Sequence, residues 1–215
     1  MTRIVLDIET NSKHNKIWLV VTKDIDTKEI KVWKAANNLK EYLDTCTLIV
    51  VQNGIGFDLP VLNNCWKMKI PLNRVYDTLI VSRLLDPSRE GGHSLDAWGQ
   101  TLNFQKIDYK AVWKWLTGYT EKDTNGLEWD QPHMGLLEDY CIRDVEVTEK
   151  LYHHLVQQIE SKGFSKESVE LEHRVADIIA EQERNGFKLD LPYATSLLAD
   201  LKGKLGKVHD RAQEL

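Results

Sequence analysis

The N-terminal stretch Ile4-Val5-Leu6-Asp7-Ile8-Glu9 decides the fold class, because it predicts a buried strand that carries two carboxylates. Its apolar residues are rich in β-branched types, which favours a strand. Side chains alternate faces along a strand, so Asp7 and Glu9 point the same way, about 7 Å apart at Cα, while Leu6 and Ile8 face the core. The alternative is a solvated strand edge. An otherwise apolar strand needs burial, however, and its carboxylates then need a partner such as a cation.

A second buried strand, expected at 47–52, leads into the loop Asn53-Gly-Ile-Gly-Phe57-Asp58. The two glycines let the backbone approach a ligand closely, and ligands bind at the carboxyl ends of strands in open α/β sheets. Asp58 precedes Pro60 closely and is therefore also well placed as a helix N-cap. Taken alone, the capping role is favoured for Asp58.

A long helix, expected at 132–159, places a carboxylate among its apolar residues. Asp144 occupies a core-like position, where an acid must be paired or must bind a metal. Tyr140 lies one turn earlier on the same face. A Tyr–Asp hydrogen bond that only locks the helix is the alternative. The predicted inward stripe comprises Leu137, Cys141, Asp144, Thr148, Leu151 and Leu155.

The remaining elements follow from apolar periodicity and turn residues. Further strands are expected at 16–22, 29–33 and 74–76, and further helices at 37–45, 59–67, 78–85, 94–102, 108–116, 166–185 and from 191 onward. Gly186 is placed as a helix C-cap. The break at 161–165 suggests one domain over 1–162 and another over 163–215. The last helix is amphipathic with little chain left to cover it, so we expect the second domain to be incomplete.

Three further groups of residues are expected to be structural. Asp77 should cap the helix at 78–85, with a supporting role at the site also open. His93 should stand at the start of a helix. The tryptophans could stack on bases but are expected to pack in the core or under a lid. These are Trp113, Trp115 and Trp129.

Composition excludes several classes of protein. The chain has 215 residues, 42% hydrophobic and 28% charged, as in globular proteins, and its net charge of −5 argues against binding nucleic acid through general basicity. Carboxylates that hold cations contribute such a negative sum. Cys46, Cys65 and Cys141 are dispersed, which indicates reduced thiols in a cytosol-like compartment and no zinc site. No apolar stretch reaches the length of a membrane span.

Together the fragments resemble a known family. Asp7-x-Glu9, Asn53-x-x-x-Phe57-Asp58 and Tyr140-x-x-x-Asp144 resemble the three motifs of the DEDD nucleases, and the tyrosine marks the DEDDy branch. Four longer segments resemble the proofreading domain of family A DNA polymerases from short-tailed phages of the T-seven type. These are 51–60, 77–84, 93–99 and 139–145. Residues 172–187 resemble the opening of the polymerase region of the same enzymes.

The resemblance implies a fold and an activity. The fold is α/β and ribonuclease H-like, a mixed five-stranded sheet flanked by helices, with a C-terminal helical extension. The activity is 3′-to-5′ hydrolysis of DNA ends to 5′-mononucleotides. The implied partners are a single-stranded DNA 3′ end and the rest of the polymerase, with no membrane. The protein would be a monomer in the cytoplasm of a phage-infected host. Polymerase activity is not expected from this chain alone.

The resemblance also implies roles for particular residues. Asp7 would bridge two Mg²⁺ or Mn²⁺ ions, Glu9 and Asp144 would complete the first ion's ligands, and Asp58 would support the second. Tyr140 would orient the attacking water. Its pKa is ordinarily near 10, which suits a positioning group better than a base. Thr10, Asn53 and Phe57 would bind the terminal nucleotide.

Two other functions stay open. One is trimming of RNA 3′ ends by a ribonuclease D-like enzyme, against which the polymerase-like segment at 172–187 argues. The other is a catalytically silent nucleic-acid-binding module. The intact set of carboxylates plus Tyr140 argues against it, because a silent site is free to lose them.

Overall fold

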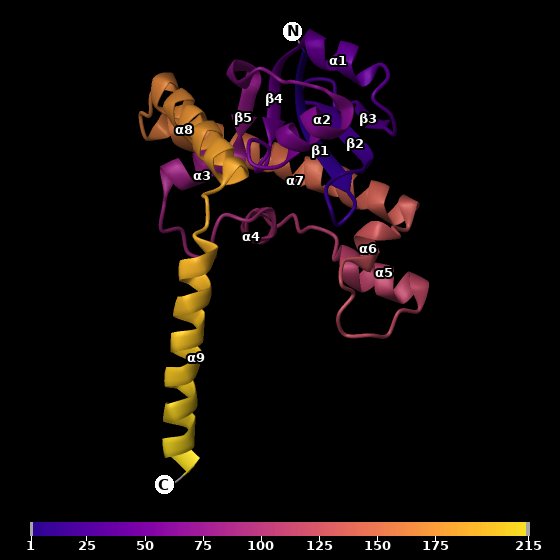
Figure 1. The fold of residues 1–215 in the computed structure, drawn as a ribbon. Helices are drawn as coiled ribbons and strands as arrows, with labels where there is room; N and C mark the ends of the chain where they lie inside the picture. Colours follow the sequence, from indigo (N-terminus) through magenta and orange to yellow (C-terminus); the bar gives the residue numbers. More distant parts are fainter. Residues whose placement is uncertain (1, 214–215) are drawn as a thin grey trace. The chain divides into compact units, whose positions relative to one another are not determined.

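A mixed sheet of five strands, in the order β3-β2-β1-β4-β5, forms the centre of the fold (Figure 1). The structure is a computed structural model that describes residues 2–213. β1 pairs antiparallel with β2 and parallel with β4, while β3 and β5 form the two edges. This arrangement confirms the predicted α/β architecture. The strands are β1 Thr2–Thr10, β2 Ile17–Asp24, β3 Ile30–Trp33, β4 Cys46–Val51 and β5 Val75–Asp77.

β1 is central and alternates between two hydrophobic cores. Ile4, Leu6 and Ile8 pack with apolar residues of α1 (Leu39–Thr45) and α2 (Asp58–Trp66) on one face. Val5 packs on the opposite face with α5 (Tyr109–Thr117) and α7 (Met134–Ser161). By strand alternation Asp7 and Glu9 share the face of Val5. The strand therefore presents its acids to α7.

The long helix α7 crosses this face of the sheet. All six residues of its predicted inward stripe are buried, Asp144 included. Its later turns pack against α3 (Thr78–Leu85) and α4 (Leu95–Thr101) through Val147, Leu151 and Leu155. Side chains of this helix thus reach the acids of β1 directly, and the core on either side of Asp144 fixes where it lies.

The other elements agree with the sequence to within a few residues, with two short exceptions. The 3-10 turn η1 (Leu72–Arg74) and the helix α6 (Leu127–Asp130) were not predicted. Segments of three or four residues are too short to show a period. The Asp77 side chain accepts the Leu79 amide, so its predicted cap of α3 is confirmed.

The chain divides into two compact units within α8 (Lys166–Asn185): the first ends at Ala180 and the second begins at Glu181. The domain boundary predicted at 162/163 from the break in the helical pattern stays a prediction. Gly186 has a φ of 64° and donates its amide to Gln182, as a C-cap does. In α9 (Leu191–Gln213) the leucines of the predicted apolar face are exposed. Within residues 2–213, no helix combines the length and apolar character that a membrane span requires.

Candidate active site

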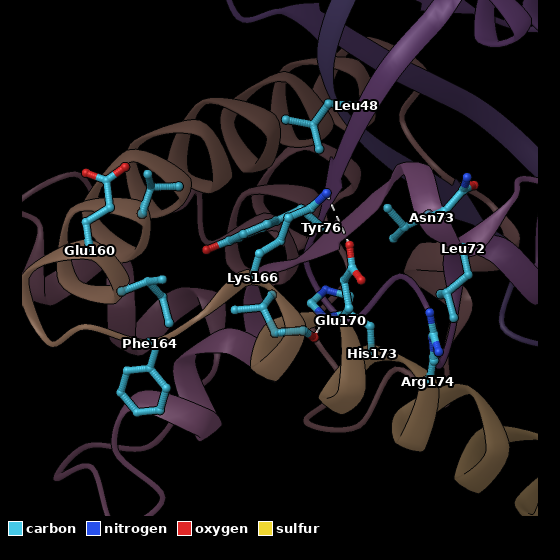
Figure 2. Close-up of a pocket in the computed structure, with 14 residues that line it drawn as sticks. Leu48, Leu72, Asn73, Tyr76, Glu160, Phe164, Lys166, Glu170, His173 and Arg174 are labelled. Carbon is cyan, nitrogen blue, oxygen red and sulfur yellow. Dashed lines mark hydrogen bonds and ion pairs between the residues drawn. The ribbon is translucent and has the colours of Figure 1, made fainter.

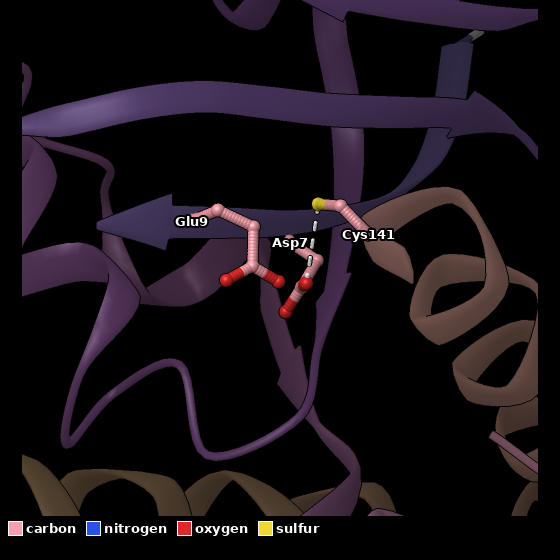
Figure 3. A group of neighbouring side chains, drawn as sticks. All are labelled: Asp7, Glu9 and Cys141. Carbon is pink, nitrogen blue, oxygen red and sulfur yellow. Dashed lines mark hydrogen bonds between the residues drawn. The ribbon is translucent and has the colours of Figure 1, made fainter. Parts of the chain in front are cut away.

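The two carboxylates of β1 meet a thiol of α7. One oxygen of Asp7, one of Glu9 and the sulfur of Cys141 all lie within 4.8 Å of one another (Figure 3). The Cys141 thiol donates a hydrogen bond to Asp7 Oδ2 at 3.3 Å. Cys141 belongs to the inward stripe of α7, and its packing brings the helix close to β1. The strand and the helix thus converge on one small polar space.

Tyr140 and Asp144 of α7, which lie on either side of Cys141 in the sequence, share a cation that sequence reasoning missed. Lys106 Nζ lies 2.6 Å from Asp144 Oδ2 and donates a hydrogen bond to the Tyr140 hydroxyl at 2.9 Å. The other oxygen, Asp144 Oδ1, is buried and has no hydrogen-bond partner within the described residues. Lys106 comes from the segment between α4 and α5, where no local pattern sets it apart. The predicted Tyr140–Asp144 pair is therefore bridged by an ammonium group.

Asp58 is the first residue of α2 and is buried. The N-cap position of α2 is held by Phe57, so the capping role favoured for Asp58 is wrong. Burial, followed by repulsion from Asp7, raises the pKa of the Asp58 carboxyl, so Asp58 instead lies within electrostatic range of Asp7. The carboxylates of Asp7, Glu9, Asp58 and Asp144, called the acidic cluster below, therefore interact with one another.

Asp77 holds the loop that leads to Asp58. Its carboxylate accepts the amides of Asn53 at 2.9 Å and Ile55 at 3.0 Å, besides that of Leu79. Gly54 allows the tight turn, because a Cβ built there would lie 2.4 Å from Val51 Cγ2. Asp77 thus does more than cap a helix: it ties the loop to the end of β5.

The three predicted nucleotide-binding residues differ in their surroundings. The Thr10 hydroxyl donates to the Asn11 carbonyl and lies 3.0 Å from His14 Nδ1. The Phe57 ring packs edge-on against the His14 ring at 4.9 Å between centroids. The structure thus gathers Thr10 and Phe57 around His14, which sequence reasoning did not single out. Asn53 is exposed at the start of its loop and adopts a φ of 61°.

The acidic cluster is electrostatically strained. Burial, followed by repulsion from Asp144, raises the pKa of Asp7 to about 7. Burial, followed by repulsion from Asp7, raises the pKa of Glu9 well above its usual range and does the same for Asp58. Burial also raises the pKa of Asp144, and the Lys106 ammonium opposes that rise. Holding all these acids ionised together requires more positive charge than Lys106 supplies.

Tyr140 keeps its proton. Burial, followed by repulsion from Asp144, raises the pKa of its hydroxyl far above the ordinary value. The ring is fixed beside Tyr109, at 5.2 Å between centroids, and Trp129, at 6.1 Å. A hydroxyl that stays protonated on an immobilised ring can orient a small molecule by hydrogen bonding but does not act as a base at neutral pH.

The donors present fit divalent cations. Oxygen ligands that carry negative charge are those Mg²⁺ and Mn²⁺ prefer, and Asp144 Oδ1, buried and without a hydrogen-bond partner among residues 2–213, is an oxygen of this kind. A cation among these groups would also relieve the repulsion that raises their pKa values.

The sheet order, the helices on its two faces and the acids at its centre define the ribonuclease H-like class of folds. Brucella melitensis NrnC is similar in structure, with a TM-score of 0.60 and 19% identity over 88% of this chain and 89% of that one. The structure of Brucella melitensis NrnC with bound Mg²⁺ gives a TM-score of 0.56 over the same shares of the two chains. These likenesses support the fold.

The chain belongs to the 3′-5′ exonuclease family of family A DNA polymerases, whose family model matches residues 4–160. It is 30% identical over 250 aligned positions to a DNA-directed DNA polymerase of Escherichia phage T7 and 29% identical to that of Enterobacteria phage T3. Each alignment covers 94% of this chain but 35% of the relative, so the chain spans about a third of these polymerases. The resemblance to phage proofreading domains is thereby confirmed.

Proposed function

We propose that this chain is a metal-dependent exonuclease that hydrolyses DNA 3′ ends to 5′-mononucleotides, as the proofreading part of a phage family A DNA polymerase. The observation that carries the proposal is the acidic cluster. Carboxylates from β1, α2 and α7 lie within electrostatic range of one another, and their pKa values are raised. Membership of an exonuclease family supports the same reading.

In this proposal Asp7, Glu9, Asp58 and Asp144 hold two Mg²⁺ or Mn²⁺ ions. When bound, the ions would activate water and stabilise charge on the phosphate and the leaving 3′ oxygen. Asp7 would be shared between the two ions, because it lies within electrostatic range of both Glu9 and Asp58: after burial, its charge is the next cause that raises their pKa values. From the facing helix, Asp144 would offer a buried oxygen that has no hydrogen-bond partner in the described part of the chain.

The remaining residues position the reactants. Tyr140 keeps its proton and so orients the attacking water by hydrogen bonding, while Lys106 fixes the direction of the phenol. Thr10 and Phe57, gathered around His14, bind the last nucleotide together with Asn53. In this way the site selects a free 3′ end and aligns its phosphodiester bond with the acidic cluster.

The relatives suggest a larger context. We assign residues 1–162 to the exonuclease domain and 163–215 to the start of a polymerase region, because the matched relatives are DNA polymerases about three times as long. The partners are then a single-stranded DNA 3′ end and the remainder of the polymerase. The protein acts as a monomer in the cytoplasm of an infected host. These residues alone are not expected to polymerise DNA.

The function is tested with two 5′-labelled single strands of one sequence, DNA and RNA, each digested in Mg²⁺ and in EDTA. We expect the DNA to shorten stepwise from its 3′ end, with no digestion in EDTA or by an Asp7→Ala/Glu9→Ala double variant. Faster shortening of the RNA would favour a ribonuclease D-like enzyme. Binding without digestion, in either Mg²⁺ or Mn²⁺, would indicate a silent module.

Replacing Lys106 by methionine is expected to shift the pH dependence of digestion. The Lys106 ammonium lowers the pKa values of Asp7 and Asp144, so without it both rise. The acid side of the rate profile should therefore move to higher pH. The check is the single-turnover rate from pH 5 to 9 in saturating Mg²⁺, with Lys40→Met as an exposed control. Superimposable profiles for the two variants would contradict this role of Lys106.

A further inference from the structure

A buried histidine of α8 binds the edge strand beside the acidic cluster. His173, which Figure 2 shows, is 3% exposed, and its Nε2 accepts the backbone amide of Asp77 at 2.7 Å. Its Nδ1 lies 2.7 Å from the Val169 carbonyl oxygen. An amide can only donate and a carbonyl can only accept, so the two contacts assign a neutral ring with its proton on Nδ1.

The bond to the Asp77 amide completes the edge of the sheet. β5 pairs only with β4 among the described strands, so the amides on its outer side have no strand partner. A buried amide without an acceptor is strongly disfavoured. His173 supplies that acceptor for Asp77, which is itself 1% exposed. The position of Asp77 therefore depends on α8 as well as on the sheet.

The side chain of Asp77 holds the loop that leads to Asp58. Its carboxylate accepts the amides of Asn53 and Ile55, and the α2 helix begins at Asp58 directly after this loop. The chain of bonds thus runs from the His173 ring to the Asp77 backbone, then to the loop amides and on to a carboxylate of the acidic cluster. Every link except the last is a hydrogen bond of 3.0 Å or less.

We propose that His173 is a positioning residue for the exonuclease reaction, which fixes Asp77 and through it the loop that sets Asp58. This inference rests on the proposed function. In this proposal α8 helps to position the acidic cluster, in addition to packing against the sheet. The ring also lines a cavity of about 450 Å³ between β5, the end of α7 and α8 (Figure 2). This space can accept a substituted side chain at position 173 without crowding.

The test compares His173→Leu, which removes the acceptor, with His173→Gln, whose amide oxygen can accept in place of Nε2. We expect the leucine variant to lose about tenfold in single-turnover rate on labelled DNA, because a displaced loop misplaces Asp58. Its DNA affinity in EDTA should change less than about twofold. The glutamine variant should recover most of the rate.

A matched control separates positioning from stability. Val169→Ala removes packing of α8 against the core that Leu151 and Leu155 of α7 form with α3 and α4, but it leaves the His173 ring and its acceptor in place. We expect its melting temperature to fall with little change in rate. If Val169→Ala slows digestion as much as His173→Leu does at a similar loss of stability, or if His173→Leu digests at the wild-type rate, His173 is only structural. Should the leucine variant not fold, His173→Asn replaces it, because asparagine is too short to reach the amide.

A readout independent of activity keeps this inference separate from the proposed function. Amide hydrogen exchange at Asn53 and Ile55 should accelerate in His173→Leu but not in Val169→Ala, since their acceptor is Asp77. Unchanged exchange in His173→Leu would overturn the positioning role even if the protein digests DNA. Failure of the wild-type protein to digest DNA would instead contradict the proposed function, and the hydrogen-exchange result would still test whether His173 positions the loop.

Discussion

Asp7→Asn is expected to reduce DNA digestion at least about a thousandfold and, at the same time, to raise the melting temperature of the metal-free protein at pH 8. The rate falls because Asp7 is the proposed bridging ligand, and loss of one strong electrostatic contact to the transition state costs about two to three orders of magnitude. Loss of a ligand shared by two ions would weaken the binding of both, so we expect a loss of rate at the upper end of that range.

Stability rises in the same variant because Asp7 is repelled in the folded protein. Its charge raises the pKa values of Glu9 and Asp58, and its own is raised to about 7. A neutral amide removes that repulsion and still offers a hydrogen-bonding oxygen to Cys141. A gain of about 3 °C in EDTA corresponds to about 1 kcal/mol in a chain of this size.

Both quantities are measured on one preparation, by single-turnover digestion in Mg²⁺ and thermal unfolding in EDTA. Asp44→Asn is the matched control, because the Asp44 carboxylate is mostly exposed and its ion pair with Arg74 is long, at 4.0 Å. It should match the wild type in both assays. An active Asp7→Asn variant, or one that is less stable without metal, would contradict the assignment of Asp7.

The metal-free protein is expected to lose stability as the pH rises from 5 to 8, and Mg²⁺ is expected to restore it. The folded-state pKa of Asp7 is about 7 against an ordinary value of 3.8, and those of Glu9 and Asp58 are raised in the same direction. At pH values between the ordinary pKa and the folded-state pKa, the folded protein keeps protons that the unfolded chain releases. The stabilisation is complete below about pH 4 and is lost as the pH rises through about 7.

The measurement is the melting temperature at pH 5, 6, 7 and 8, in EDTA and in excess Mg²⁺. We expect a fall of about 5 °C across this range in EDTA, and a rise on adding Mg²⁺ that is larger at pH 8 than at pH 5. In Asp7→Asn/Glu9→Gln the fall and the Mg²⁺ response should both shrink. Stability that rises toward pH 8 in EDTA would mean that the acids are not repelled in the folded state.

Local periodicity predicted the parts of this fold that depend on neighbouring residues. The alternation in β1 placed Asp7 and Glu9 on one face, and the period of α7 placed Asp144 and Cys141 among the buried residues. The strands and the longer helices follow for the same reason, since burial of one face imposes a repeat on the sequence.

Contacts between distant residues could not be predicted in this way. Lys106 meets Tyr140 across 34 positions, and His173 meets the Asp77 amide across 96. Each is one polar residue in an ordinary local setting, and its role comes only from tertiary packing. Asp58 is a case in which the local sequence predicted the wrong role. An aspartate two residues before a proline suits a helix cap, yet the helix begins at Asp58 itself, and its buried carboxylate lies within electrostatic range of Asp7.

The central claim, that the acidic cluster holds divalent cations, is tested most directly by calorimetric titration of Mn²⁺ in the presence of a 5′-mononucleotide. We expect two ions per chain for the wild type, and at least about a tenfold weaker affinity for Asp7→Asn than for the Asp44→Asn control. Equal Mn²⁺ binding by wild type and Asp7→Asn, or no binding by either, would contradict it.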